Sequence, residues 1–173
     1  QAERYYQEVT DSINSDKKKY NLVKKKESHW FMKTTKGPYP RFWFSMAYNP
    51  LSGNTIFHGG WGEPPSHDWV YIPATNLSDT WIWNDTIWKK VTDGIALSRS
   101  AMVFDYNLSN MIMFGGDVRN IRTKQTWELS VGNWVTINKA GPEGRLEPDL
   151  VFDKQRKTVL LFGGVARRAS GPG

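Results

Sequence analysis

A pair of adjacent glycines recurs three times along the chain and constrains its fold more than any other feature. The pairs are Gly59-Gly60, Gly115-Gly116 and Gly163-Gly164, at spacings of 56 and 48 residues. Eleven residues before each pair stands an aromatic residue, followed at once by an Asn or Asp that favours a turn: Tyr48-Asn49, Phe104-Asp105 and Phe152-Asp153. Such self-similarity, at a period of about 50 residues, predicts a repeat protein that builds one unit several times.

Pairs of tryptophans seven residues apart follow the first two glycine pairs. They are Trp81 with Trp88 and Trp127 with Trp134. An arginine comes eleven residues after each second tryptophan, at Arg99 and Arg145, and the same offset joins Trp30 to Arg41. We therefore interpret Trp30 as the second tryptophan of an earlier, incomplete unit.

The segments between these markers are predicted to be short β-strands, because they are rich in β-branched and aromatic residues and separated by turn formers. Examples are Phe44–Tyr48, Thr55–His58, Asp79–Trp83 and Ile87–Val91. Continuous apolar runs at 111–114 and 158–162 predict strands that are buried on both faces. The segments 81–83 and 127–129 suit outer strands whose large rings cover a neighbouring sheet. Four strands in about 50 residues is typical of a propeller blade.

The most complete unit reads MVFDYNLSNMIMFGG, then QTWELSVGNWVTI, then GPEGR, and the last reads LVFDKQRKTVLLFGG. These segments closely resemble kelch repeats of the bacterial, galactose-oxidase-like type, which have a double glycine after the second strand and a tryptophan pair on the third and fourth. The resemblance covers residues 20–165 and implies an all-β fold of kelch-type β-propeller blades, each with four antiparallel strands. An unrelated β-sandwich explains the repeated tryptophan pairs less well.

The predicted strands amount to three blades' worth. Two strands at 20–25 and 28–34 form a half blade, residues 41–91 and 99–137 form two full blades, and strands at 147–152 and 158–163 form a last half blade. Propellers typically need roughly four to eight blades to close, so the fold is expected to be a partial or half propeller.

Two explanations of this count stay open. The chain is either a piece of a longer propeller, or it forms a homodimer in which two copies complete a six-bladed ring and cover each other's strand edges. The ending at 169–173 resembles a loop and slightly favours the first.

Residues at the two ends fall outside the repeat. Residues 1–19 are interpreted as an N-terminal lead-in, either a short helix, because apolar residues recur near helical spacing, or a disordered segment. Residues 166–173 are interpreted as a C-terminal loop or tail.

In kelch proteins, partner contacts usually come from loops on one face, including those after the double glycine. The first such loop, residues 61–78, is ten residues longer than its counterpart after Gly116, and long loops in compact domains are often functional. The candidate binding residues are aromatic on the first loop and basic on the next two: Trp61, His67, Trp69, Tyr71, Arg119, Arg122, Lys124 and Arg167. For Trp69 and Tyr71, extending a strand and capping the ring from above is an equal alternative to binding. For any single basic residue, a solvated loop position is the favoured one.

The sequence gives little support for catalysis. The related copper oxidases use a Tyr cross-linked to Cys, and this chain has no Cys. His58 stands where the other units have Phe114 and Phe162, which favours a packed ring over a metal ligand. A site built from His58, Glu63, His67 and Asp68 has no fixed spacing, so no metal or other cofactor is expected.

Charge and composition narrow the partners. The net charge is +6, much of it in two lysine clusters at 17–19 and 24–26, and no alternation of basic and aromatic residues supports nucleic acid as a partner. No run approaches the roughly 18 apolar residues of a membrane helix, so no membrane span is expected.

The sequence therefore predicts a non-enzymatic interaction module that binds a protein segment or a glycan through loops on one face. The alternatives are part of a carbohydrate-active lyase or oxidase whose active site lies in missing blades, and a structural subunit of a larger assembly. The absence of Cys, the nine Trp and the bacterial type of repeat favour an extracellular or periplasmic location, with the cytoplasm as the alternative.

Overall fold

The computed structural model describes residues 32–64, 73–137 and 141–166. The chain divides into two compact parts, residues 1–33 and residues 34–173, and all described strands belong to the second part. The predicted lead-in at 1–19 and the strand predicted at 20–25 lie outside the described residues, as does most of the strand predicted at 28–34.

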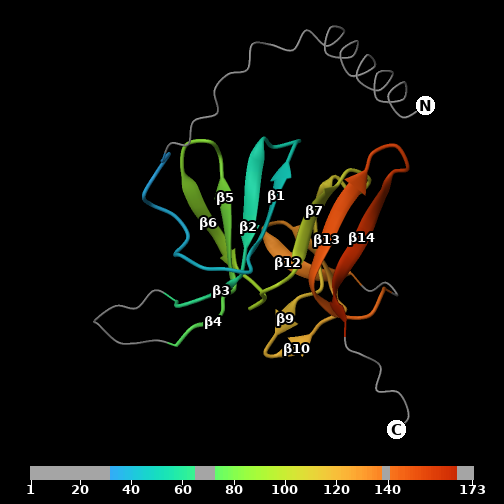
Figure 1. The fold of residues 1–173 in the computed structure, drawn as a ribbon. Coiled ribbons are helices and arrows are strands. Elements are labelled where there is room, and N and C mark those ends of the chain that lie inside the picture. The colour runs from blue at the N-terminus through green and yellow to red at the C-terminus, as the bar shows by residue number, and fades with distance from the viewer. Residues whose placement is uncertain (1–31, 65–72, 138–140, 167–173) are drawn as a thin grey trace, which may run out of the picture. The chain divides into compact units, whose positions relative to one another are not determined.

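Two four-stranded antiparallel sheets and one two-stranded sheet follow one another in the second part (Figure 1). Sheet 1 has the order β1-β2-β5-β6, with β1 at Ser45–Asn49, β2 at Asn54–His58, β5 at Asp79–Trp83 and β6 at Trp88–Asp93. Sheet 2 has the order β7-β8-β11-β12, with β7 at Ala101–Asp105, β8 at Asn110–Phe114, β11 at Thr126–Ser130 and β12 at Asn133–Ile137. Sheet 3 pairs β13 at Arg145–Asp153 with β14 at Thr158–Ala166.

The predicted fold class is confirmed. The described part of the chain is all-β, and its two four-stranded antiparallel sheets have the same strand order, as in part of a β-propeller. The first strands of successive sheets are neighbours, since β7 contacts β1 as well as β13. Among the described residues there is no helix that could cross a membrane.

The turn between the first two strands is built identically in all three sheets. The side-chain oxygen of Asn49 accepts hydrogen bonds from the backbone N–H groups two and three residues later, at 3.0 and 3.2 Å. Asp105 and Asp153 do the same in their own turns. The Asn or Asp after each aromatic residue therefore acts as the turn former that the sequence predicted.

The glycine pairs are the points at which one unit meets the next. Gly60 N–H donates to the carbonyl of Leu97 at 2.9 Å, and Gly116 N–H donates to that of Arg145 at 2.8 Å. Gly59 has a φ of 63°, and a Cβ there would lie closer than 3.0 Å to the Leu97 carbonyl oxygen. Only glycine fits both the left-handed backbone and this close approach.

The core lies mainly between sheets 1 and 2. The first two strands of sheet 2 contribute four of its residues, and Trp127 and Trp134 add two large rings. This buried cluster consists of Ile56, Leu97, Met102, Phe104, Met111, Met113, Trp127 and Trp134. The rings of the outer strands of sheet 2 therefore cover the neighbouring sheet, as predicted.

Two short hairpins were not predicted. They pair β3 (Trp61–Gly62) with β4 (Thr75–Asn76), and β9 (Asp117–Val118) with β10 (Ile121–Arg122). Both lie in the segments that follow a glycine pair, and with only two residues a strand they are too short to give a periodic signal.

The prediction that residues 158–162 are buried on both faces is wrong. Leu160 and Phe162 in β14 are exposed, whereas the equivalent residues of β8, Ile112 and Phe114, are buried. The difference arises because β8 lies between two sheets, while β14 has a described sheet on one side only.

The arginines that share one offset from a tryptophan are not all equivalent. Arg41 and Arg145 each stand 18 residues before their glycine pair and donate from Nη1 to the carbonyl of its first glycine, at 3.2 and 3.1 Å. Arg99 stands only 16 residues before its pair, where the other units have Trp43 and Glu147. The eleven residues between each tryptophan and its arginine include the link from one sheet to the next. Because this link differs in length, the same offset leads to a different structural position in the unit that contains Arg99.

Candidate functional site

The segments after the first two glycine pairs meet at one end of the sheets. Figure 1 shows β3, β4, β9 and β10 together at this end. The side-chain nitrogen of Asn76 in β4 donates to the backbone carbonyl of Asp117 in β9 at 3.1 Å and to its carboxylate at 3.2 Å. The hairpins of two successive units therefore form one continuous loop face.

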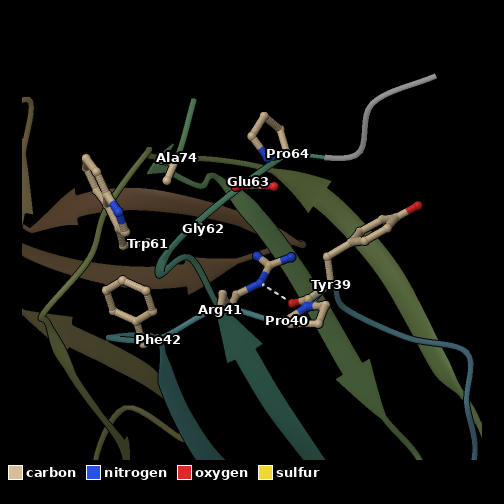
Figure 2. Close-up of a pocket in the computed structure, with 9 residues that line it drawn as sticks. All are labelled: Tyr39, Pro40, Arg41, Phe42, Trp61, Gly62, Glu63, Pro64 and Ala74. Carbon is tan, nitrogen blue, oxygen red and sulfur yellow. Dashed lines mark hydrogen bonds between the residues drawn. The ribbon is translucent and has the colours of Figure 1, made fainter. Parts of the chain in front are cut away.

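A pocket of about 700 Å³ lies on this face beside β3. An isolated bridge between Phe42 and Trp61 fixes one wall, with backbone hydrogen bonds of 3.1 and 2.7 Å. Figure 2 shows these two residues on one side of the opening and Tyr39 on the other. The full lining is Tyr39, Pro40, Arg41, Phe42, Trp61, Gly62, Glu63, Pro64 and Ala74.

Arg41 is part of the floor of this pocket. Its guanidinium pairs with the Asp79 carboxylate and donates from Nε to the carbonyl of Tyr39 at 2.9 Å, the bond drawn in Figure 2. The Arg41 side chain is buried, so its charge is paired with Asp79 and holds the segment before β1 against sheet 1. Glu63 is exposed and has no recorded ion pair among the described residues, so its carboxylate is free to accept hydrogen bonds from a ligand.

Asp79 is held in its charged form. Burial, the largest single influence, raises the pKa of its carboxyl group, but hydrogen bonds from Arg41 and Trp81 together with the Arg41 charge lower this pKa below its usual value. The Trp81 ring nitrogen donates to the same carboxylate at 2.6 Å. The ion pair is therefore a structural element beneath the pocket.

Two of the four predicted basic residues lie at a second hollow of about 460 Å³. Arg122 and Lys124 line it together with apolar residues that include Val118, Ile121 and Trp127. Arg122 donates to the carbonyl of Ala166 at 2.8 Å and so ties the second hairpin to β14. Arg119 is exposed in the β9–β10 turn and lines neither pocket.

Of the eight predicted binding residues, the structure thus describes Trp61 in the first pocket, Arg122 and Lys124 in the second, and Arg119 outside both. His67, Trp69, Tyr71 and Arg167 lie outside the described residues. Sequence reasoning missed Tyr39, Phe42 and Glu63. Phe42 stands 17 residues before its glycine pair, where Ser98 forms the matching bridge to Asp117, so an alignment on the glycine pairs would have placed it on this face.

His58 lies between sheets 1 and 2, away from the loop face. Its Nε2–H donates to the Ile95 carbonyl at 3.0 Å, because a carbonyl can only accept, and its Nδ1 accepts from the Thr80 hydroxyl at 2.9 Å. Desolvation by burial lowers the pKa of His58 to about 4. Both ring nitrogens are occupied, and no group of metal-binding side chains forms among residues 32–64, 73–137 and 141–166.

Comparison with known proteins does not extend these observations: no protein-family model matches the chain, and no curated protein sequence matches it.

Proposed function

We propose that the chain is part of a kelch-repeat β-propeller that acts as a non-enzymatic interaction module, in an extracellular or periplasmic setting. Three observations support the propeller fold. The first two double glycines bond the next unit, the turns between the first two strands are identical, and tryptophan rings fill the space between sheets 1 and 2. The rigid sheets serve as a scaffold, and the loop face supplies the contacts.

The ligand is a glycan, or a protein segment that presents a similar apolar face beside hydrogen-bond donors. The observation that carries this proposal is the pocket whose walls are the rings of Tyr39, Phe42 and Trp61, with the Glu63 carboxylate at its edge. The C–H groups of a sugar ring pack on aromatic faces, and its hydroxyl groups donate to a carboxylate. Aromatic residues in a concave site are also typical anchors of peptide ligands.

Calorimetric titration with two sets of probes tests the proposal. One set contains neutral oligosaccharides of glucose, galactose and N-acetylglucosamine, and the other contains proline-containing peptides. Trp61→Ala is expected to weaken the binding of the preferred probe about 30-fold or more, the usual loss at an aromatic hot spot of about 2 kcal/mol. Glu63→Gln separates the hydrogen bonds to the carboxylate from the packing on the aromatic rings, because it removes the negative charge and keeps the shape of the side chain.

Leu51→Ala is the matched control, since Leu51 is exposed in the β1–β2 turn and lines neither described pocket. It is expected to leave binding unchanged. Thermal melts of all three variants accompany the titrations. If Trp61→Ala unfolds the protein, or leaves the affinity for every bound probe unchanged, the pocket is not the binding site.

A further inference from the structure

Neighbouring sheets contact each other through the same positions at both junctions. We name two faces by counting back from the first glycine of each pair. The trailing face holds the residues 12, 3 and 1 positions earlier, and the leading face of the next sheet holds those 13 and 11 positions earlier. At the first junction these are Ala47, Ile56 and His58 against Met102 and Phe104, and at the second they are Val103, Ile112 and Phe114 against Leu150 and Phe152.

Burial and ring contacts support these assignments. At the first junction, Ile56, Met102 and Phe104 share one buried cluster, and the His58 ring lies 5.3 Å from the ring of Trp134 in sheet 2. At the second junction, the Phe152 ring lies 5.1 Å from that of Tyr106, which follows β7. The trailing residues Ile112 and Phe114 are buried there as well.

The two outermost faces of the same kind are uncovered among the described residues. On the trailing face of sheet 3, Val151 is 58%, Leu160 46% and Phe162 81% exposed. On the leading face of sheet 1, Met46 is 52% and Tyr48 57% exposed. These side chains occupy positions that are buried or half-buried at the two internal junctions, so each outer face lacks the other's counterpart.

The backbone shows the same pattern at the trailing end. Gly163 has a φ of 66°, like the first glycines of the other pairs. A Cβ on Gly59 or Gly115 would collide with a carbonyl of the next unit, but a Cβ on Gly163 would meet nothing within 4 Å. The place where a further unit would approach is open.

The leading end carries the complementary groups. The carbonyl of Arg41 corresponds by position to those of Leu97 and Arg145, which accept from the second glycine of the preceding unit. The N–H of Trp43 corresponds to those of Arg99 and Glu147, which donate to the preceding unit at 2.8 Å each. Neither the Arg41 carbonyl nor the Trp43 N–H has a recorded backbone partner among the described residues.

We propose that the partner of these two ends is a second copy of this chain. The trailing face of sheet 3 in each copy packs on the leading face of sheet 1 in the other, and Gly164 N–H donates to the carbonyl of Arg41 of the partner subunit. The ring holds three sheets from each copy, six in all, within the range of about four to eight at which propellers close. A twofold axis relates the copies and leaves no uncovered face.

The mass of the full chain in solution, measured by light scattering behind a sizing column at two concentrations, tests this proposal. The wild type is expected at twice 19.9 kDa. Phe162→Asp on the trailing face, Met46→Asp on the leading face and Gly163→Ala at the backbone contact are each expected to halve this mass. Val131→Asp is the control, because Val131 is exposed in the β11–β12 turn and belongs to neither face.

The variants also test the direction of the contact. Phe162→Asp keeps an intact leading face and Met46→Asp keeps an intact trailing face, so an equimolar mixture is expected to recover dimers that each variant alone does not form. Circular dichroism spectra and thermal melts show whether each variant is folded. A wild-type mass of 19.9 kDa at both concentrations, a mass that grows beyond two copies, or a folded Phe162→Asp that stays dimeric would overturn the proposal.

Discussion

At the scale of single residues, a chain of hydrogen bonds joins sheets 1 and 2. The Trp134 ring nitrogen donates to the Thr80 hydroxyl at 3.1 Å, the hydroxyl donates to His58 Nδ1, and His58 Nε2–H donates to the Ile95 carbonyl. His58 and Thr80 are almost fully buried. Each polar group on this path has a partner, so the junction stays well defined without an apolar residue at position 58.

This arrangement predicts a loss of stability in mild acid. The pKa of His58 is about 4 in the folded protein, against 6.5 when unfolded, so the unfolded state binds more protons between these values. The free energy of unfolding is therefore expected to fall by roughly 3 kcal/mol as the pH drops from 6.5 to 4. Urea unfolding at several pH values, followed by tryptophan fluorescence, measures this change in the free energy of unfolding.

His58→Phe provides the control, because phenylalanine occupies the same position in the other two units. The variant is expected to lose most of the pH dependence between 6.5 and 4, while Thr80 keeps its hydrogen bond from Trp134. An unchanged slope in this variant would mean that other groups carry the dependence.

At the scale of single elements, the glycine pairs show why local sequence and long-range contact must agree. Gly53 and Gly59 have similar φ values, 71° and 63°, but Gly53 lies in an open turn and Gly59 faces the Leu97 carbonyl. Gly53→Ala is expected to cost about 1–2 kcal/mol, from the left-handed backbone alone. Gly59→Ala is expected to lower the free energy of unfolding by more than that, because the segment that contains Leu97 must also move. Equal losses for the two variants in urea unfolding would contradict a close contact at Gly59.

The β11–β12 turn contains a local conflict that can be relieved. Val131 and Gly132 both have positive φ, 48° and 82°, a conformation that Asn-Gly adopts easily and a β-branched residue does not. Val131→Asn is expected to raise the free energy of unfolding by about 1 kcal/mol, since the side chain is exposed and loses no packing. An unchanged or lower melting temperature for Val131→Asn would contradict backbone strain at Val131.

The strands and turns could be predicted because their signals are local. Alternating or continuous apolar runs placed the strands, and Asn49, Asp105 and Asp153 marked turns whose side chains bond the backbone within three residues. The pocket could not be predicted in the same way. Phe42 and Trp61 meet only through an isolated bridge between distant segments, and the role of Arg41 depends on Asp79, 38 residues away.

At the scale of the whole molecule, one junction repeats along the described chain and is left open at both ends. The exposed Phe162 and the vacant space at Gly163 correspond to residues that are covered in the preceding units. Sequence counting predicted three blades' worth of strands and left a longer propeller and a homodimer open. The Arg41 carbonyl and the Trp43 N–H have no backbone partner among the described residues, and the homodimer that we propose would pair both.

A crystal structure of the full chain tests the repeated junction most directly. We expect two copies about a twofold axis, with Trp43 N–H donating to the carbonyl of Glu147 of the partner subunit at a distance near the 2.8 Å of the Arg99–Trp43 and Glu147–Arg99 bonds. We also expect Phe162 to be buried against Met46 and Tyr48 of the partner subunit. A structure in which Phe162 and Met46 remain in solvent, or are covered by different segments, would contradict the repeated junction.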